Sequence, residues 1–247
     1  MIIEAKLKRD QYVIHTKMEH RSKNMDKKVR NWLIAFGAFF VLSIVFTILV
    51  LTVDVRASFN NPKLGLASMN EKVFNAIGES SFWYYFTQAL GYLAILVVVI
   101  FAVIGVIQLI KGKSFKKVDK EIIGLGIVYI VIAIIYVFFE KVVVINYRPI
   151  LEDGEVAASF PSSHTLLACV VFSTALIEAK KLINVKFIKE NIIFLIEFLV
   201  ILMIGGRLLS GVHWLSDIIA SVLYSGVIVS GYYLAMCYLD TKTVKEE

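Results

Sequence analysis

Cysteine is scarce in this chain, and its scarcity excludes two kinds of site. The 247 residues include only two cysteines, Cys169 and Cys237, and both lie inside apolar runs. Two cysteines in such surroundings are too few for a disulfide framework or for a thiolate metal cluster. We therefore expect both of them to be packing residues.

Hydrophobic residues, by contrast, are abundant. They make up 58% of the chain, and the mean hydropathy is +0.76, whereas soluble domains are about 45 to 50% apolar. A spanning helix needs about 20 mostly apolar residues, because lipid cannot satisfy exposed backbone groups. We therefore predict an all-α, polytopic membrane protein with six transmembrane helices in a bundle. The stretches that qualify are 31–53, 82–110, 122–140, 164–183, 192–209 and 217–239.

The distribution of lysine and arginine predicts the orientation of these helices. Basic residues concentrate before residue 31 and in the connections at 111–120 and 180–189. Such residues are retained on the cytoplasmic side of a membrane, so both termini are expected to be cytoplasmic. The net charge of +6 does not indicate nucleic-acid binding, because the cations are scattered between apolar runs and do not share one aromatic-bearing face.

The domain organisation is simple. No repeat of about 20 to 50 residues occurs, and the polar gaps are too short to separate domains. The N-terminal segment is basic and has no apolar region before a cleavage site, so we do not predict a signal peptide. We expect a basic cytoplasmic tail at 1–30 and one six-helix membrane domain at 31–247.

Ionisable residues cluster in the segments predicted to face outward. Of the four histidines, His164 and His213 fall at the outer ends of predicted helices, and Lys141, Arg148 and Arg207 precede them. Each ionisable residue at membrane depth costs about 2.5 to 3.5 kcal/mol on insertion scales, so such a cluster indicates function. Guanidinium groups bind phosphate oxygens bidentately, and lysine adds a point charge. The cluster therefore predicts a phosphate site.

Two further features fit phosphate chemistry. The backbone amides of Ser162 and Ser163 lie just before a predicted helix, where the positive end of the helix dipole favours an anion. Asp217 follows His213 by four residues, which places both on one helix face. A carboxylate that accepts from one imidazole nitrogen leaves the other nitrogen free as a nucleophile, and His164 would then protonate the departing oxygen. Asp217 is alternatively an N-cap of the last helix, and the two roles are compatible.

Three segments resemble the signatures of a known family. KVVVINYRP at 141–149, PSSH at 161–164 and GRLLSGVHWLSD at 206–217 are similar, in this order, to the motifs KxxxxxxRP, PSGH and SRxxxxxHxxxD of the type 2 phosphatidic acid phosphatase superfamily. Ser163 stands in place of a glycine, which is tolerated unless the backbone there needs a positive φ. Gly206 stands in place of a serine, which removes a hydroxyl and any hydrogen bond that it would make.

This resemblance implies a role for each residue. His213 is expected to be the nucleophile that forms a phosphohistidine, with Asp217 as its partner and His164 as the acid that later activates water. The sequence has no second cluster of acidic residues or histidine for magnesium, so we expect no metal and no cofactor, with cations stabilising the charge instead. The phosphate would be bound by Lys141, Arg148, Ser162, Ser163 and Arg207.

The position of these residues constrains the substrate. All of them lie at the outer ends of helices, so we expect a lipid phosphate bound at the extracytoplasmic face of the cell membrane. The resemblance implies phosphatidate, phosphatidylglycerol phosphate or a polyprenyl diphosphate such as undecaprenyl diphosphate, and an extracytoplasmic site favours the last two. A phosphotransferase with an alcohol acceptor and a non-enzymatic lipid-phosphate binder or transporter remain alternatives. The sequence does not indicate an oligomeric state.

Two neighbouring segments have open interpretations. Aromatic residues at 82–86 form either an interfacial belt or part of a substrate entrance. The segment 54–81 has a weak amphipathic pattern and would cover the site if it folds as a short helix.

Overall fold

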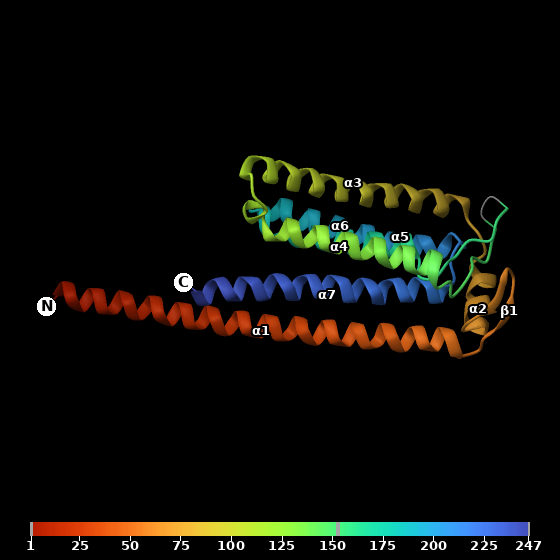
Figure 1. Ribbon diagram of the computed structural model, residues 1–247, viewed down its shortest axis with the longest axis horizontal. Helices are drawn as coiled ribbons and strands as arrows, with labels where there is room; N and C mark the ends of the chain where they lie inside the picture. Colours follow the sequence, from red (N-terminus) through yellow and green to blue (C-terminus); the bar gives the residue numbers. More distant parts are fainter. Residues whose placement is uncertain (1, 152–153, 247) are drawn as a thin grey trace.

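A computed structural model shows long helices side by side, with a small cap at one end of the bundle (Figure 1). It describes residues 2–151 and 154–246, with side chains for 23–151, 154–178 and 183–242. In chain order the elements are α1 (Ile2–Thr52), β1 (Arg56–Ser58), β2 (Asn61–Leu64), α2 (Ala67–Ile77), α3 (Ser81–Gly112), the 3-10 helix η1 (Phe115–Lys117), α4 (Lys120–Val137), the π-helix η2 (Phe138–Val142), α5 (Ser163–Leu182), α6 (Lys186–Leu209) and α7 (Leu215–Glu246).

The all-α, polytopic fold predicted from the sequence is confirmed. In the part of the chain with described side chains, five helices are long and apolar enough to cross a membrane: α1, α3, α4 with η2, α6 and α7. The sixth predicted span is α5, a helix of 20 residues whose described apolar stretch, Ser163–Glu178, is shorter than the others. Helix α1 continues without a break through residue 30, so the predicted border between tail and membrane domain stays a prediction.

Helix α5 is the least hydrophobic predicted span because its neighbours surround it. Leu166 and Val170 pack into a core with α4 and α7, whereas Ala168 and Phe172 pack into a second core with α3 and α6. Small and polar residues are therefore tolerated along α5, since little of its described surface would meet lipid. Cys169 is buried among them, in agreement with a packing role.

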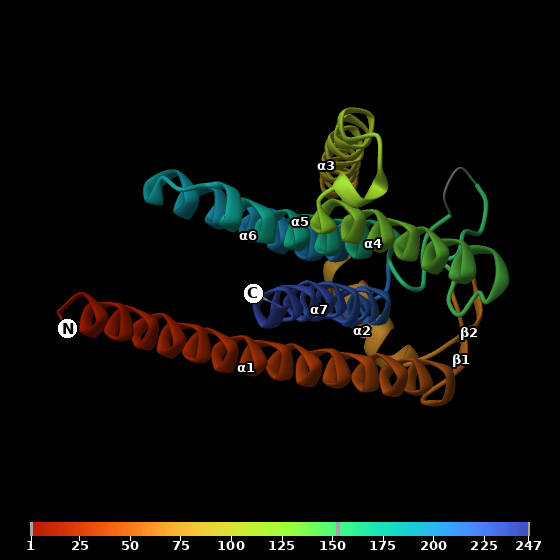
Figure 2. The ribbon, with the colours of Figure 1, turned by 60° about the vertical axis from the view of Figure 1, so that its left-hand side comes forward.

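Helices α1 and α7 form the other side of the bundle and lie side by side in both ribbon views (Figures 1 and 2). The rings of Trp32 and Tyr233 stack with centroids 4.3 Å apart, and the hydroxyls of Thr47 and Tyr224 are 2.8 Å apart. Gly226 permits this close approach, because a Cβ there would lie 2.4 Å from the Phe39 ring. This pairing fixes the position of α7, which carries Asp217.

The segment between α1 and α3 forms the cap. Strands β1 and β2 pair antiparallel, and Glu71 of α2 accepts hydrogen bonds from Arg56 and Ser58. The 54–81 segment therefore contains the short helix that its weak amphipathic pattern suggested. This helix packs against Trp214 in the loop before α7, and its Asn70 donates a hydrogen bond to Ser216 of α7. Both termini lie at the opposite end of the bundle (Figure 1).

Candidate active site

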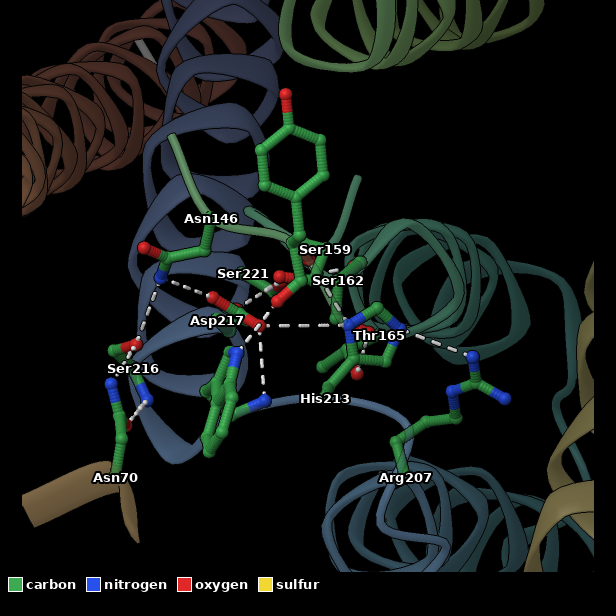
Figure 3. Close-up of polar contacts among 12 residues, drawn as sticks. Asn70, Asn146, Ser159, Ser162, Thr165, Arg207, His213, Ser216, Asp217 and Ser221 are labelled. Atoms are coloured by element: carbon green, nitrogen blue, oxygen red, sulfur yellow. Dashed lines mark hydrogen bonds and ion pairs between the residues drawn. The ribbon is translucent and has the colours of Figure 1, made fainter. Parts of the chain in front are cut away.

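Three distant parts of the chain meet at the capped end of the bundle (Figure 3). The connection between η2 and α5 folds back on itself, and an antiparallel β-bridge joins Tyr147 to Ala158. The N–H of Ser159 therefore donates to the carbonyl of Asn146. The short loop between α6 and α7 carries His213, and the first turn of α7 carries Asp217. The cluster is therefore assembled by residues at the ends of helices and in the loops between them.

His213 is held from both sides of its ring. Its Nδ1 lies 3.0 Å from the carbonyl oxygen of Ser159, and its Nε2 lies 3.1 Å from Nη2 of Arg207. A guanidinium can only donate, so Nε2 must be the acceptor, and Nδ1–H then donates to the carbonyl. This tautomer leaves the lone pair of the imidazole on Nε2, the nitrogen that faces Arg207.

The surroundings of His213 favour its neutral form. Burial lowers the pKa of His213 well below its ordinary value, and the charges of Arg207 and Arg148 lower it further. The hydrogen bond to Ser159 acts in the opposite direction. A neutral imidazole is the form that can attack phosphorus.

Asp217 is fully buried, and amide groups hold its carboxylate. Asn146 Nδ2 donates to Oδ1 and the backbone N–H of Trp214 donates to Oδ2, each at 3.0 Å. Oδ2 lies 3.8 Å from Nδ1 of His213, which is an ion-pair distance and longer than a hydrogen bond. The structure thus differs from the expected Asp217–His213 hydrogen bond, because the Ser159 carbonyl occupies that position. Asp217 lies inside the first turn of α7 and does not occupy its N-cap.

Arg207 reaches from the last turn of α6 toward α3. The side chain is fully buried, its Nη1 lies 3.4 Å from Oγ1 of Thr87, and its guanidinium carbon lies 5.9 Å from the centre of the Tyr84 ring. Both contacts come from α3, which carries no signature residue. The aromatic segment 82–86 is therefore divided: Tyr84 and Trp83 face α6, whereas the side chains of Phe82 and Tyr85 are exposed.

The PSSH segment begins α5. Ser162 is fully buried; its N–H donates to the Asp217 carbonyl at 3.3 Å, and its hydroxyl shares a hydrogen bond with Thr165. Ser163 is the first helical residue, and N–H groups of a first turn lack intrahelical acceptors. Ser163 is not among the positive-φ residues of the described chain, so its Cβ causes no backbone strain.

The remaining predicted residues lie in different surroundings. His164 packs against Gly91 of α3, where a Cβ would lie 2.7 Å from the imidazole, and its Nδ1 has no hydrogen-bond partner among the described residues. Arg148 is half-buried and lines a cavity of about 230 Å³ together with Ser210 and Tyr84. Lys141 is exposed on η2, and no contact found within the described residues joins it to the cluster.

A second cavity extends from the site along the helices. It has a volume of about 430 Å³, lies between α3, α4 and α5, and has His164 and Ser163 at one end. Apolar side chains form most of its wall, including Ile95, Ile132 and Leu167. This groove and the cavity at Arg148 share no lining residue, and each lies next to residues of the predicted site.

Sequence reasoning missed several residues of this site. Thr87 and Gly91 come from a helix without a signature, and the carbonyl of Ser159 is a backbone group that no residue pattern reveals. Tyr84 belongs to the aromatic segment 82–86, but its contact with Arg207 was not predicted. Asn146 lies within KVVVINYRP, between the signature residues Lys141 and Arg148. This position was the available indication that Asn146 belongs to the site. In the part of the chain that the structure describes, no three metal-binding side chains of histidine, cysteine or acidic type gather.

The fold and the site together define a membrane-embedded member of a phosphatase superfamily. The sequence profile of the PAP2 superfamily matches residues 80–240, and the chain belongs to this family. The crystal structure of a transmembrane PAP2-type phosphatidylglycerolphosphate phosphatase from Bacillus subtilis has the same fold, with a TM-score of 0.55. The two chains are 16% identical, and the match covers 81% of this chain and 94% of the other. No curated protein matches the chain.

Proposed function

We propose that the protein is a metal-independent lipid phosphatase that works through a phosphohistidine at the extracytoplasmic face of the membrane. The observation that carries this proposal is the state of His213, which is buried, has Nδ1–H bonded to a carbonyl and presents the Nε2 lone pair to a buried guanidinium. An entering phosphate competes for the donors of Arg207 and thereby frees Nε2 for attack.

The first step transfers the phosphoryl group to the enzyme. Nε2 of His213 forms a bond to phosphorus while the bond from phosphorus to the lipid oxygen breaks, and His164 supplies the proton that this oxygen takes up. Arg207 and Arg148 stabilise the charge on the equatorial oxygens, and Asp217 stabilises the imidazolium that forms. His164 is suited to this role because its Nδ1 is not occupied by a partner among the described residues.

The second step returns the enzyme to its starting state. His164, now neutral, takes a proton from water, and the hydroxide attacks phosphorus as the bond to His213 breaks. Inorganic phosphate leaves, and both histidines are restored. A charge-stabilising metal is not needed in this scheme, because the guanidinium groups carry out that function.

The two cavities support a lipid substrate. The polar cavity at Arg148 accommodates a headgroup, and the apolar groove that begins at His164 accommodates hydrocarbon. The solved structure with the same fold is that of a phosphatidylglycerolphosphate phosphatase. We therefore propose phosphatidylglycerol phosphate, phosphatidate and a polyprenyl diphosphate as the substrates to compare.

Release of phosphate from these three lipids by purified protein in detergent tests the proposal. We expect turnover that persists in EDTA, that vanadate inhibits as a transition-state mimic, and that His213→Ala abolishes. His20→Ala, in the basic N-terminal segment, is the matched histidine control and should keep full activity. Loss of turnover in EDTA with rescue by magnesium, or full activity of His213→Ala, would contradict the mechanism.

A further inference from the structure

Helix α3 contacts the phosphate-binding arginine at a place where α6 has no side chain. Gly206 is buried against α3, and a Cβ there would lie 2.7 Å from Cγ2 of Thr87 and 2.9 Å from the ring of Trp83. The absence of a side chain at 206 therefore lets Thr87 come within reach of the next residue, Arg207. The hydroxyl that the serine of the family signature would bring to this region is missing, and a hydroxyl from another helix is present.

The hydrogen bonds of Thr87 fix the direction of its contact with Arg207. Oγ1 lies 2.8 Å from the carbonyl oxygen of Trp83 and 3.0 Å from that of Tyr84, so the single hydroxyl proton is donated within α3. The lone pairs of Oγ1 remain to accept from Nη1 of Arg207 at 3.4 Å. Thr87 is fully buried, which keeps water from taking its place.

Contacts at both Nη atoms bear on the orientation of the planar guanidinium of Arg207. Nη1 of Arg207 is held by Thr87, Nη2 points to Nε2 of His213, and the ring of Tyr84 lies 5.9 Å from the guanidinium carbon. Without the Thr87 hydroxyl, Nη1 would face a methyl group and the plane could turn away from His213. We infer that Thr87 is a positioning residue that holds Arg207 in the orientation needed to bind the phosphate beside His213.

This inference rests on the proposed function, because it assigns Arg207 to phosphate. Its consequence is that the phosphate-binding unit includes α3, through a contact between residues 120 positions apart. Gly206 and Thr87 form a matched pair in which the smaller residue on α6 makes room for the side chain on α3. A change at either position should therefore weaken anion binding more than it lowers the stability of the fold.

Substitutions at Thr87 separate its hydroxyl from its methyl group. Thr87→Val keeps the shape and removes the acceptor, whereas Thr87→Ser keeps the acceptor and removes the methyl. We expect the inhibition constant of vanadate to rise about five- to tenfold in Thr87→Val, as for loss of one hydrogen bond of ordinary strength. Thr87→Ser should stay within about twofold of the native protein. Thr174→Val is the matched control, because that buried hydroxyl lies within hydrogen-bond distance of the carbonyls of Val170 and Val171 in its own helix.

Equal vanadate inhibition of Thr87→Val and the native protein would overturn the inference, and so would an equal loss in Thr87→Ser. If Thr87→Val fails to fold, Gly206→Ser tests the same contact: its Cβ would meet both Thr87 and Trp83, so it should weaken vanadate inhibition. Unchanged vanadate inhibition in Gly206→Ser would count against a matched pair. Vanadate binding measured as a rise in Tm distinguishes the two proposals, because binding without turnover overturns the phosphatase alone, and no binding by the native protein overturns both.

Discussion

At the scale of single residues, the chemistry depends on which nitrogen of His213 carries the proton. The Ser159 carbonyl accepts from Nδ1 at 3.0 Å, whereas the nearer carboxylate oxygen of Asp217 lies at 3.8 Å. The backbone therefore orients the ring, and in the proposed mechanism Asp217 acts through its charge on the imidazolium of the intermediate. These two tasks are often combined in one carboxylate, and here they are separated.

Asp217→Asn tests this separation. Removal of the charge should lower kcat about 10- to 100-fold, equivalent to about 1.4 to 2.7 kcal/mol, and the tautomer should persist because the Ser159 carbonyl is still present. Steady-state phosphate release compared with His213→Ala is the measurement. If Asp217→Asn is as inactive as His213→Ala, then Asp217 and not Ser159 orients the ring.

Residue patterns predicted one part of this site and could not predict the other. Side-chain chemistry at fixed spacing predicted roles for His164, His213, Asp217 and Arg207, because each signature is local in sequence. The Ser159 carbonyl is a backbone group, and Thr87 meets Arg207 only through the packing of α3 on α6. Lys141 has the spacing of the family signature, yet its side chain is exposed on a π-helix, so its role in binding stays a prediction.

At the scale of elements, the loop between α6 and α7 sets the position of His213. Gly211 has a φ of +73°, and a Cβ there would lie 2.5 Å from the carbonyl oxygen of Gly78. The N–H of Ser80 donates to the carbonyl of Ser210 at 3.4 Å, so the loop packs directly on the segment that leads into α3. Gly211 thus permits both the turn and the close approach.

Gly211→Ala should displace this loop. A non-glycine residue in that conformation costs about 1 to 3 kcal/mol, and the contact with Gly78 adds strain, so we expect a lower Tm together with weaker phosphate release. Gly205→Ala is the matched control, since a Cβ at 205 meets nothing within 4 Å and alanine favours a helix. An unchanged Tm in Gly211→Ala, or an equal loss in both variants, would show that the loop does not need glycine.

The cap is joined to the site by a buried asparagine. Asn70 of α2 donates to the hydroxyl of Ser216 at 2.9 Å and accepts from the Ser216 N–H at 3.0 Å, next to Asp217. The sequence of 54–81 does not indicate this polar contact, because Asn70 meets Ser216 only through the packing of α2, which also places Ala67 and Phe74 against Trp214.

Replacement of Asn70 should therefore disturb the site from outside it. Asn70→Ala leaves the buried N–H of Ser216 without its acceptor, so we expect a destabilisation of about 1 to 3 kcal/mol and a lower kcat. Asn75→Ala changes an exposed residue of the same helix and should have little effect. Thermal unfolding and phosphate release of both variants are the measurements. A native Tm and native phosphate release in Asn70→Ala would show that the contact between the cap and α7 does not affect the site.

At the scale of the whole molecule, the basic segments and the candidate active site lie at opposite ends of the bundle. The termini and the lysine-rich η1 connection lie at one end, and the cap and the site lie at the other (Figure 1). Both termini therefore lie on one side of the bundle, and the assignment of that side to the cytoplasm stays a prediction from the basic residues. The spans were predictable because lipid imposes length and hydrophobicity, whereas the helical continuation of α1 through the basic tail was not, since no apolar pattern marks it.

A phosphoryl group on His213 is the central claim, and its direct detection is the most decisive test. In the proposed mechanism His164 activates the attacking water, so His164→Ala should slow the second step. A polyprenyl phosphate leaves without the proton that a lipid alcohol needs, so a labelled polyprenyl diphosphate should still phosphorylate this variant, and an alkaline quench should trap the phosphoenzyme. We predict an acid-labile, alkali-stable label on the peptide that contains His213, and no label in the His164→Ala, His213→Ala double variant. Label on another residue, or native turnover by His213→Ala, would contradict the account.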